Sequence, residues 1–255
     1  MHRLGPAAAA FLVLLGAWEA YVAIAGVEEA VLPAPHEVAS SLWNNRGLIS
    51  HNFAVTAEEV VLGLALALAA GLALAVAVHV LPWVRRAVYP LLVGSQAIPV
   101  PVIGVLLVFW WGFGLLPKLL VIALICFFPV VVTTVDGLAA VDPEQRKLLR
   151  TLDATRWQAF RLGELPAALP AALSGTRIAL AVGVIGAFIA ETTTPTTGAY
   201  PGLGREILSD VNFQTSRAYA GTAVLFAFAI VCFYALAVAE RRIAPWSIER
   251  REEAR

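Results

Sequence analysis

Long runs of apolar residues, separated by short polar segments, dominate the chain. Six runs have roughly the 18 to 25 residues that a helix needs to cross about 30 Å of hydrocarbon. They cover residues 7–25, 58–80, 89–111, 116–138, 170–190 and 218–239. Because the runs do not alternate polar and apolar residues, as strands of a membrane barrel do, they predict helices. The pattern predicts an all-α integral membrane protein with six transmembrane helices in one domain, residues 1–255.

Composition agrees with this pattern. Hydrophobic residues make up 60% of the chain and charged residues only 14%, whereas soluble domains carry about 25% charged residues. The first run follows only His2 and Arg3, and Glu19 and Tyr21 stand where a signal peptidase would need small residues. We therefore expect this run to be a retained helix and not a cleaved signal peptide.

Basic residues outside the six runs, or close to their ends, are distributed unevenly. The chain has 18 lysines and arginines, and only Arg46, Lys118, Arg205 and Arg217 fall on one side of the predicted topology. The side that carries the majority is expected to be cytoplasmic. Both termini, including the tail 241–255, are therefore predicted in the cytoplasm. The chain has no net charge, so we expect no nucleic-acid partner.

The longest predicted cytoplasmic loop, residues 139–169, contains signals for two short helices. Asp142 can cap a helix of about 143–152, with a proline at its first position. Asp153 then stands where the chain must turn sharply, and aspartate tolerates the left-handed conformation. A second helix is expected over about 155–163, ended by Pro166 and Pro170, after which the next span begins.

The second of these helices carries aromatic and basic side chains. Trp157 and Phe160 are three residues apart, and Arg161 lies four residues beyond Trp157. Such a segment can lie in the membrane interface, with the tryptophan at the headgroups and arginines on anionic lipid. It can equally be a docking surface for a soluble partner, and these residues alone leave both alternatives open.

The order of motifs in this loop carries a resemblance. KLLRTLD (147–153), ATRWQAFR (154–161) and LPAALP (165–170) together resemble the cytoplasmic signature loop of permease subunits in bacterial ABC importers. Lys147 replaces the usual glutamate of that motif, and Asp153 replaces its usual glycine. The turn survives the second replacement if Asp153 is left-handed.

Further segments extend the resemblance to residues 30–245. LPAPHEV (32–38), FWWGFGLLPKLL (109–120) and FFPVVVTTVDGL (127–138) are similar to permeases for nitrate, sulfonate and taurine. TAEEVVLG (56–63) and YPLLVGSQAIP (89–99) look most like importers of pyrimidine thiamine precursors and riboflavin. The resemblance therefore implies such a substrate, with taurine, alkylsulfonate or nitrate as the alternative.

The resemblance also implies a set of partners in a bacterial cytoplasmic membrane. These are a dimer of cytoplasmic ABC ATPase subunits, a second permease copy, an extracytoplasmic substrate-binding protein and the lipid bilayer. The chain lacks G-x-x-x-x-G-K-[ST], so we expect it to bind no cofactor and the partner ATPase to use ATP and Mg. No catalytic or metal site is expected.

The resemblance implies that the loop couples the permease to the ATPase, with Trp157 and Phe160 as candidate anchors and Arg156 and Arg161 as rim charges. The coupling residues implied here are Arg146, Lys147, Arg150, Leu152, Asp153, Ala154, Arg156, Trp157, Phe160, Arg161, Leu165 and Pro166.

Polar residues within the predicted spans are the remaining candidates. Gln96 is a candidate to line a translocation pathway, because Pro99 and Pro101 follow it and loosen the helix. A helix-to-helix hydrogen bond between subunits explains Gln96 equally well. Arg177 is expected to pair with Asp136, the alternative being that both snorkel independently to the interface.

Two other functional classes make different predictions. An ion-gradient-driven secondary transporter predicts an inverted repeat and paired broken helices. A membrane enzyme predicts clustered catalytic residues near one face. The sequence contains neither pattern, so the permease interpretation is preferred.

Overall fold

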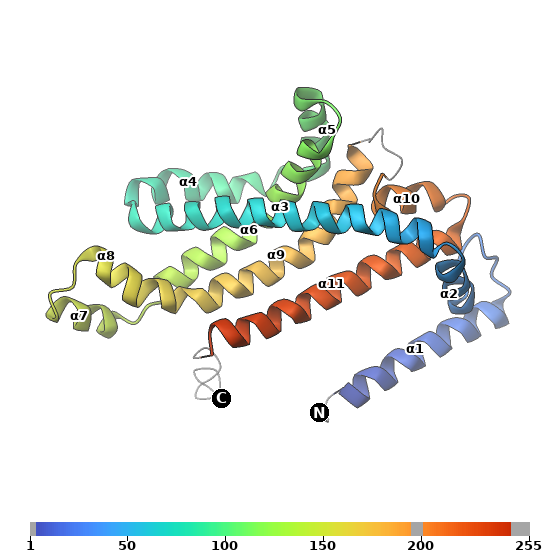
Figure 1. Cartoon of the computed structure of the whole chain (residues 1–255), viewed down its shortest axis with the longest axis horizontal. Coiled ribbons are helices and arrows are strands. Elements are labelled where there is room, and N and C mark those ends of the chain that lie inside the picture. Colours follow the sequence, from blue (N-terminus) through green and yellow to red (C-terminus); the bar gives the residue numbers. More distant parts are fainter. Residues whose placement is uncertain (1–3, 195–200, 246–255) are drawn as a thin grey trace. The chain divides into compact units, whose positions relative to one another are not determined.

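Helices make up all regular structure in residues 4–194 and 201–245, the part of the chain that the computed structural model describes (Figure 1). These residues form two compact units. The first unit comprises Met1–Ala57 and Thr197–Ala227, and the second comprises Glu58–Thr196 and Phe228–Arg255. The chain is thus all-α, as its pattern predicts.

The first unit contains helices α1 (Leu4–Ala25), α2 (Pro35–Asn44) and α10 (Leu203–Asp210). It also contains the beginnings of α3 (Arg46–Val80) and α11 (Thr215–Ile243). Polar side chains join α3 to α10: Thr56 accepts a hydrogen bond from the backbone N–H of Leu203 at 2.8 Å, and Asn52 donates to Glu206. Arg217 forms a salt bridge with Asp210.

The second unit is built around α6 (Leu115–Ala139) and α9 (Leu165–Thr193), which pack along each other (Figure 1). It also holds most of α3 (Arg46–Val80), helices α4 (Pro82–Ser95), α5 (Val100–Trp111), α7 (Pro143–Thr151) and α8 (Arg156–Ala159), the π-helical turn η1 (Phe160–Glu164), and the end of α11 (Thr215–Ile243).

Glycines allow α6 to approach its neighbours closely. A methyl group at Gly63 of α3 would lie 2.6 Å from Ile122, and one at Gly175 of α9 would lie 1.8 Å from the hydroxyl of Thr133. Either distance is far inside van der Waals contact, so these positions exclude any larger residue at the present helix separation.

The predicted span 89–111 is wrong as a single helix. The structure has α4 and α5 there instead, and their axes differ in direction by 103°. Pro99 takes an extended conformation as the N-cap of α5, and neither it nor Pro101 has an N–H to continue the ladder from α4. The bend is visible where α5 leaves the line of α4 in Figure 1.

Four of the other predicted spans coincide with helices α3, α6, α9 and α11 but differ from them in length. Four helices of the described chain are long and apolar enough to cross a membrane, or five if the bent α4–α5 pair counts as one span. In α1 the apolar stretch Ala9–Ala25 is shorter than the 18 residues that a spanning helix requires. Helix α3 begins at Arg46, well before the predicted residue 58, and the helical run before Thr193 begins at Arg156.

Candidate functional site

The turn between α7 and α8 has the geometry that its sequence predicts. Asp142 caps α7 by accepting the N–H of Glu144 at 2.8 Å. Asp153 has φ 52°, the only positive φ of a non-glycine residue in the described chain. The N–H of Ala154 reaches back to the carbonyl of Leu149 at 3.0 Å, which is the Schellman arrangement that ordinarily takes glycine.

Helix α8 begins with a capping box. Thr155 accepts the N–H of Gln158 through its hydroxyl at 3.3 Å, and the Gln158 amide oxygen accepts the N–H of Thr155 at 2.8 Å. The prediction that prolines end this helix is wrong. The chain continues through η1 into α9, with Pro166 in the first turn of α9 and Pro170 inside that helix.

The two aromatic residues of α8 and η1 differ sharply in exposure. The Trp157 side chain is 67% exposed, whereas Phe160 is 9% exposed and packs with Leu138 and Ala168. Their rings stack with centroids 5.7 Å apart. Phe160 is therefore a core residue that supports Trp157, and its prediction as a docking anchor is wrong because its ring is covered by this chain.

The remaining predicted loop residues lie mostly on the surface. Lys147, Leu152, Asp153, Arg156, Arg161 and Leu165 are exposed, while Ala154 and Pro166 are half-buried. The side chains of Arg146 and Arg150 lie outside the described residues. Two leucines that sequence reasoning missed, Leu148 and Leu162, are 59% and 67% exposed. The loop therefore presents apolar and basic side chains together.

A side-chain contact ties this loop to α3. His79, in the last turn of α3, lies 2.8 Å from a carboxylate oxygen of Glu164 in η1. The His79 ring is also 6.4 Å from the ring of Phe160. This contact could not be predicted from the sequence, because 85 residues separate the two partners.

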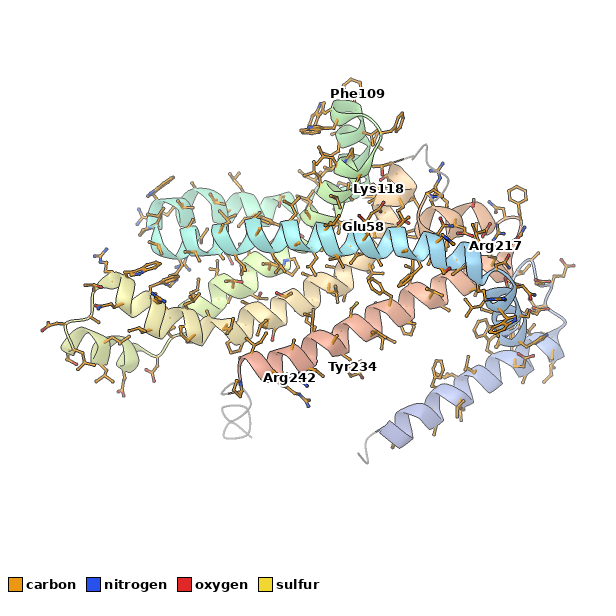
Figure 2. All side chains as sticks on the ribbon, in the orientation of Figure 1. Glu58, Phe109, Lys118, Arg217, Tyr234 and Arg242 are labelled. Carbon is orange, nitrogen blue, oxygen red and sulfur yellow. The ribbon has the colours of Figure 1, made fainter. Side chains whose placement is uncertain are left out.

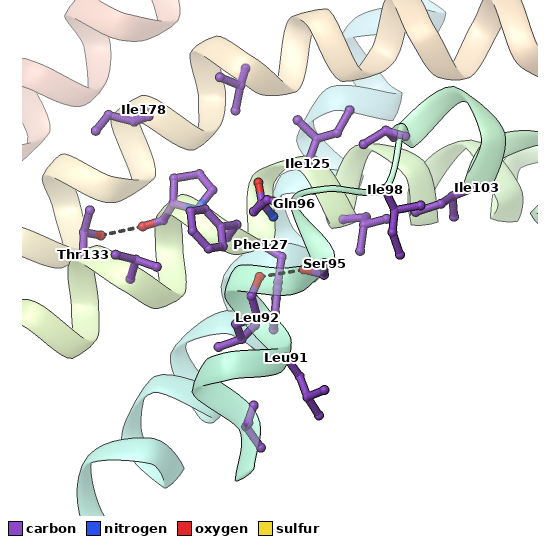
Figure 3. Close-up of a pocket in the computed structure, with 17 residues that line it drawn as sticks. Leu91, Leu92, Ser95, Gln96, Ile98, Ile103, Ile125, Phe127, Thr133 and Ile178 are labelled. Carbon is purple, nitrogen blue, oxygen red and sulfur yellow. Dashed lines mark hydrogen bonds between the residues drawn. The ribbon is translucent and has the colours of Figure 1, made fainter. Parts of the chain in front are cut away.

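Gln96 lines a half-open cavity of about 710 Å³ between α4, α5, α6 and α9 (Figure 3). The cavity wall is largely aliphatic and aromatic, with Ser95, Gln96 and Thr133 as its polar members. Pro99 and Pro101 are not among the described residues that line the cavity. The two prolines instead set the break that brings Gln96 to the cavity.

The predicted pair of Arg177 and Asp136 is wrong. Arg177 forms its salt bridge with Glu240 of α11, and its guanidinium lies 5.2 Å from the centre of the Phe233 ring. Asp136 is exposed. Sequence reasoning missed Glu240 because that residue lies just beyond the last predicted span, 218–239, next to the arginines of the tail.

Sequence reasoning also missed a buried ion pair. Lys118 of α6 (labelled in Figure 2) donates to Glu59 of α3 at 2.6 Å, and Glu191 of α9 is within hydrogen-bond reach of Glu59. Each of these three residues is at most 2% exposed. Lys118 lies two residues inside the predicted span 116–138. A charged residue inside a span requires a partner, and this position could have indicated the ion pair.

Comparisons with known proteins agree with this architecture. Residues 64–245 match the family described as the inner membrane component of binding-protein-dependent transport systems. The formylaminopyrimidine transport permease ThiX of Halalkalibacterium halodurans is 33% identical over 92% of this chain and 93% of its own length. The riboflavin transport permease RibX of Chloroflexus aurantiacus is 33% identical over 92% and 87%. The taurine transport permease TauC of Escherichia coli is 29% identical over 92% and 86%.

A solved structure shares the fold. The crystal structure of an amino acid ABC transporter with histidines superposes with a TM-score of 0.60 at 19% identity, covering 79% of this chain and 97% of that chain. The match of most of the chain to one family model, and the near full-length relatives, decide the classification. This protein belongs to the family of inner membrane components of binding-protein-dependent transport systems, and it is a multi-pass permease subunit of an ABC importer.

Proposed function

We propose that the chain forms the translocation pathway for a small solute and that a partner ATPase drives its alternating access. The proposed assembly has two permease copies, two cytoplasmic ATPase subunits and an extracytoplasmic binding protein, with both termini of the permease in the cytoplasm. ATP hydrolysis belongs to the partner, because the family to which this chain belongs supplies the membrane component.

The surface of the α7–α8 segment carries the proposal for coupling. Trp157 is exposed over a buried Phe160, and Arg156 and Arg161 are exposed beside it. A large aromatic side chain with adjacent arginines is the composition of an interface hot spot. Two capped helices joined by a left-handed Asp153 hold that surface rigidly, which lowers the entropic cost of docking.

The proposed substrate is a pyrimidine thiamine precursor or a riboflavin-like compound. Support comes from the relatives named for formylaminopyrimidine and riboflavin, each 33% identical to this chain. The alternative is taurine, alkylsulfonate or nitrate, since the taurine permease is 29% identical over a similar length.

Co-purification of the ATPase tests the coupling surface. The permease is reconstituted in nanodiscs with its candidate ATPase, and wild type is compared with a Trp157→Ala, Arg161→Glu double variant. We expect the variant to stay folded and to lose at least tenfold in ATPase affinity, because hot-spot truncations cost about 2 kcal/mol or more.

The matched control changes the same residue types elsewhere. Trp43 is 69% exposed, and the Arg46 guanidinium lies 4.8 Å from its ring centre, so Trp43→Ala with Arg46→Glu removes a similar pair on the side predicted to face outward. This control should retain the ATPase. If the Trp157 variant also retains the ATPase, the segment is an interfacial helix and the proposed coupling through it is wrong. If wild type recruits no ATPase, the candidate is not the partner that the proposal requires.

A further inference from the structure

The chemistry of the cavity beside Gln96 separates the candidate substrates. Figure 3 draws 17 residues that line it, and none of them is aspartate, glutamate, lysine, arginine or histidine. An anion that enters this space gives up part of its hydration without gaining a cation, which is unfavourable. A sulfonate, nitrate or zwitterion therefore finds no counter-charge on this wall.

The polar groups that are present suit hydrogen bonds with a neutral ligand. The hydroxyl of Ser95 donates to the carbonyl of Leu92 and that of Thr133 to the carbonyl of Pro129, each at 2.8 Å. Both hydroxyls therefore offer mainly acceptor lone pairs to the cavity. The side-chain amide of Gln96 makes no hydrogen bond within the described residues, so its donor and acceptor are both available.

The free donor and acceptor of the Gln96 amide can pair with a ligand that presents a hydrogen-bond donor next to an acceptor. Glutamine pairs bidentately with a nitrogen heterocycle that presents an N–H donor beside a ring-nitrogen acceptor, as it does with adenine. The same wall includes Phe127 and Phe128, and aromatic side chains favour planar rings through stacked or edge contacts. The cavity volume of about 710 Å³ lies within the range of small-molecule sites, about 300–1,000 Å³.

We infer that this cavity is a binding site for an uncharged, planar nitrogen heterocycle, with the Gln96 amide bonding the ligand edge and Phe127 and Phe128 contacting its ring face. The inference rests on the proposed transport function, because it places the cargo of that function in a defined part of the chain. It assigns selection against anions to the permease itself, in addition to any selection by a binding protein.

Direct binding to the full chain tests this site. The permease is held in nanodiscs together with any ATPase that co-purifies, and riboflavin binding is followed by quenching of its own fluorescence without nucleotide. Formylaminopyrimidine and taurine are added as competitors. We expect formylaminopyrimidine to displace riboflavin and taurine to leave the signal unchanged.

Variants locate the binding. Gln96→Leu should weaken riboflavin binding roughly tenfold, the loss expected for about two neutral hydrogen bonds. Gln214→Leu removes an exposed glutamine of the other unit and should bind as wild type does. Both variants are first shown to be monodisperse by size exclusion.

Three outcomes would overturn the inference: displacement by taurine, absence of riboflavin and formylaminopyrimidine binding, or Gln96→Leu binding as wild type does. Loss of the proposed importer function has a different signature, namely failure of the ATPase to co-purify. Because the binding measurement needs no ATPase or nucleotide, it decides the cavity assignment in either case.

Discussion

Replacing Lys118 with methionine should destabilise the membrane-embedded protein more than any other single removal of a positive charge. Lys118 donates to Glu59 at 2.6 Å and is 1% exposed. Methionine keeps the length of the side chain and removes its charge. The change leaves the Glu59 carboxylate, which is 2% exposed, without the ammonium that it contacts.

Two estimates of the cost agree. Breaking a buried ion pair by removing one partner costs about 3–5 kcal/mol. The folded protein can instead protonate one carboxyl. At pH 7 this costs about 4 kcal/mol relative to the unfolded chain, in which a glutamate has its ordinary pKa of about 4.3, at 1.36 kcal/mol per pH unit. We therefore expect the free energy of unfolding to fall by about 4 kcal/mol at pH 7. The loss should shrink as the pH is lowered, because protonation then costs less.

Unfolding by sodium dodecyl sulfate in mixed micelles, followed by tryptophan fluorescence, measures this difference. The chain contains one other lysine, the exposed Lys147, so Lys147→Met is a matched control and should change stability by less than about 0.5 kcal/mol. Adding Glu59→Gln to Lys118→Met should restore part of the loss, because the second change removes one uncompensated carboxylate.

The reasoning fails if Lys118→Met unfolds within about 1 kcal/mol of wild type, or if the loss is independent of pH. It also fails if the double variant is destabilised by the full sum of the two single changes, since residues in contact must show a coupling energy.

Two further predictions concern other positions. Burial raises the pKa of Glu206, and Asp210 raises it further, against the lowering effects of Asn52 and Arg217. The folded state therefore binds the proton more tightly than the unfolded state, so the free energy of unfolding should fall as pH rises from 4.5 through the raised pKa. In Glu206→Gln the free energy of unfolding should depend less on pH across that range. Gly175→Ala should cost about 1–3 kcal/mol in the same unfolding assay, whereas Gly94→Ala, with no atom within 4 Å of the new methyl group, should not destabilise.

Local signals in the sequence predicted local structure well. Asp142, Asp153 and Thr155 each determine a helix end through interactions with residues at most five positions away. Such signals are readable because the partner is always close in the sequence. The apolar runs likewise predicted the main helices, since their length and lack of alternation leave few other structures.

Contacts between distant segments could not be read in this way. The partner of Arg177 depends on how α9 and α11 are rotated about their axes, and two acidic residues near the same depth were compatible with the sequence. Glu240 makes the salt bridge and Asp136 does not. The burial of Phe160 depends on Leu138 of α6 and Ala168 of α9, and helical spacing alone does not distinguish a covered aromatic from an exposed one.

The contacts beneath Trp157 connect the α7–α8 segment to the long helices of the second unit, and a displacement of the segment would be transmitted through them. Phe160, which stacks under Trp157, packs against α6 through Leu138 and against α9 through Ala168. Glu164 contacts His79 of α3 at 2.8 Å, and η1 runs into α9 without a break. Close-packed interiors transmit displacements and do not absorb them. In the proposed importer, a partner that moves Trp157 must therefore move α3, α6 and α9 together, and α6 and α9 also contribute to the wall of the Gln96 cavity.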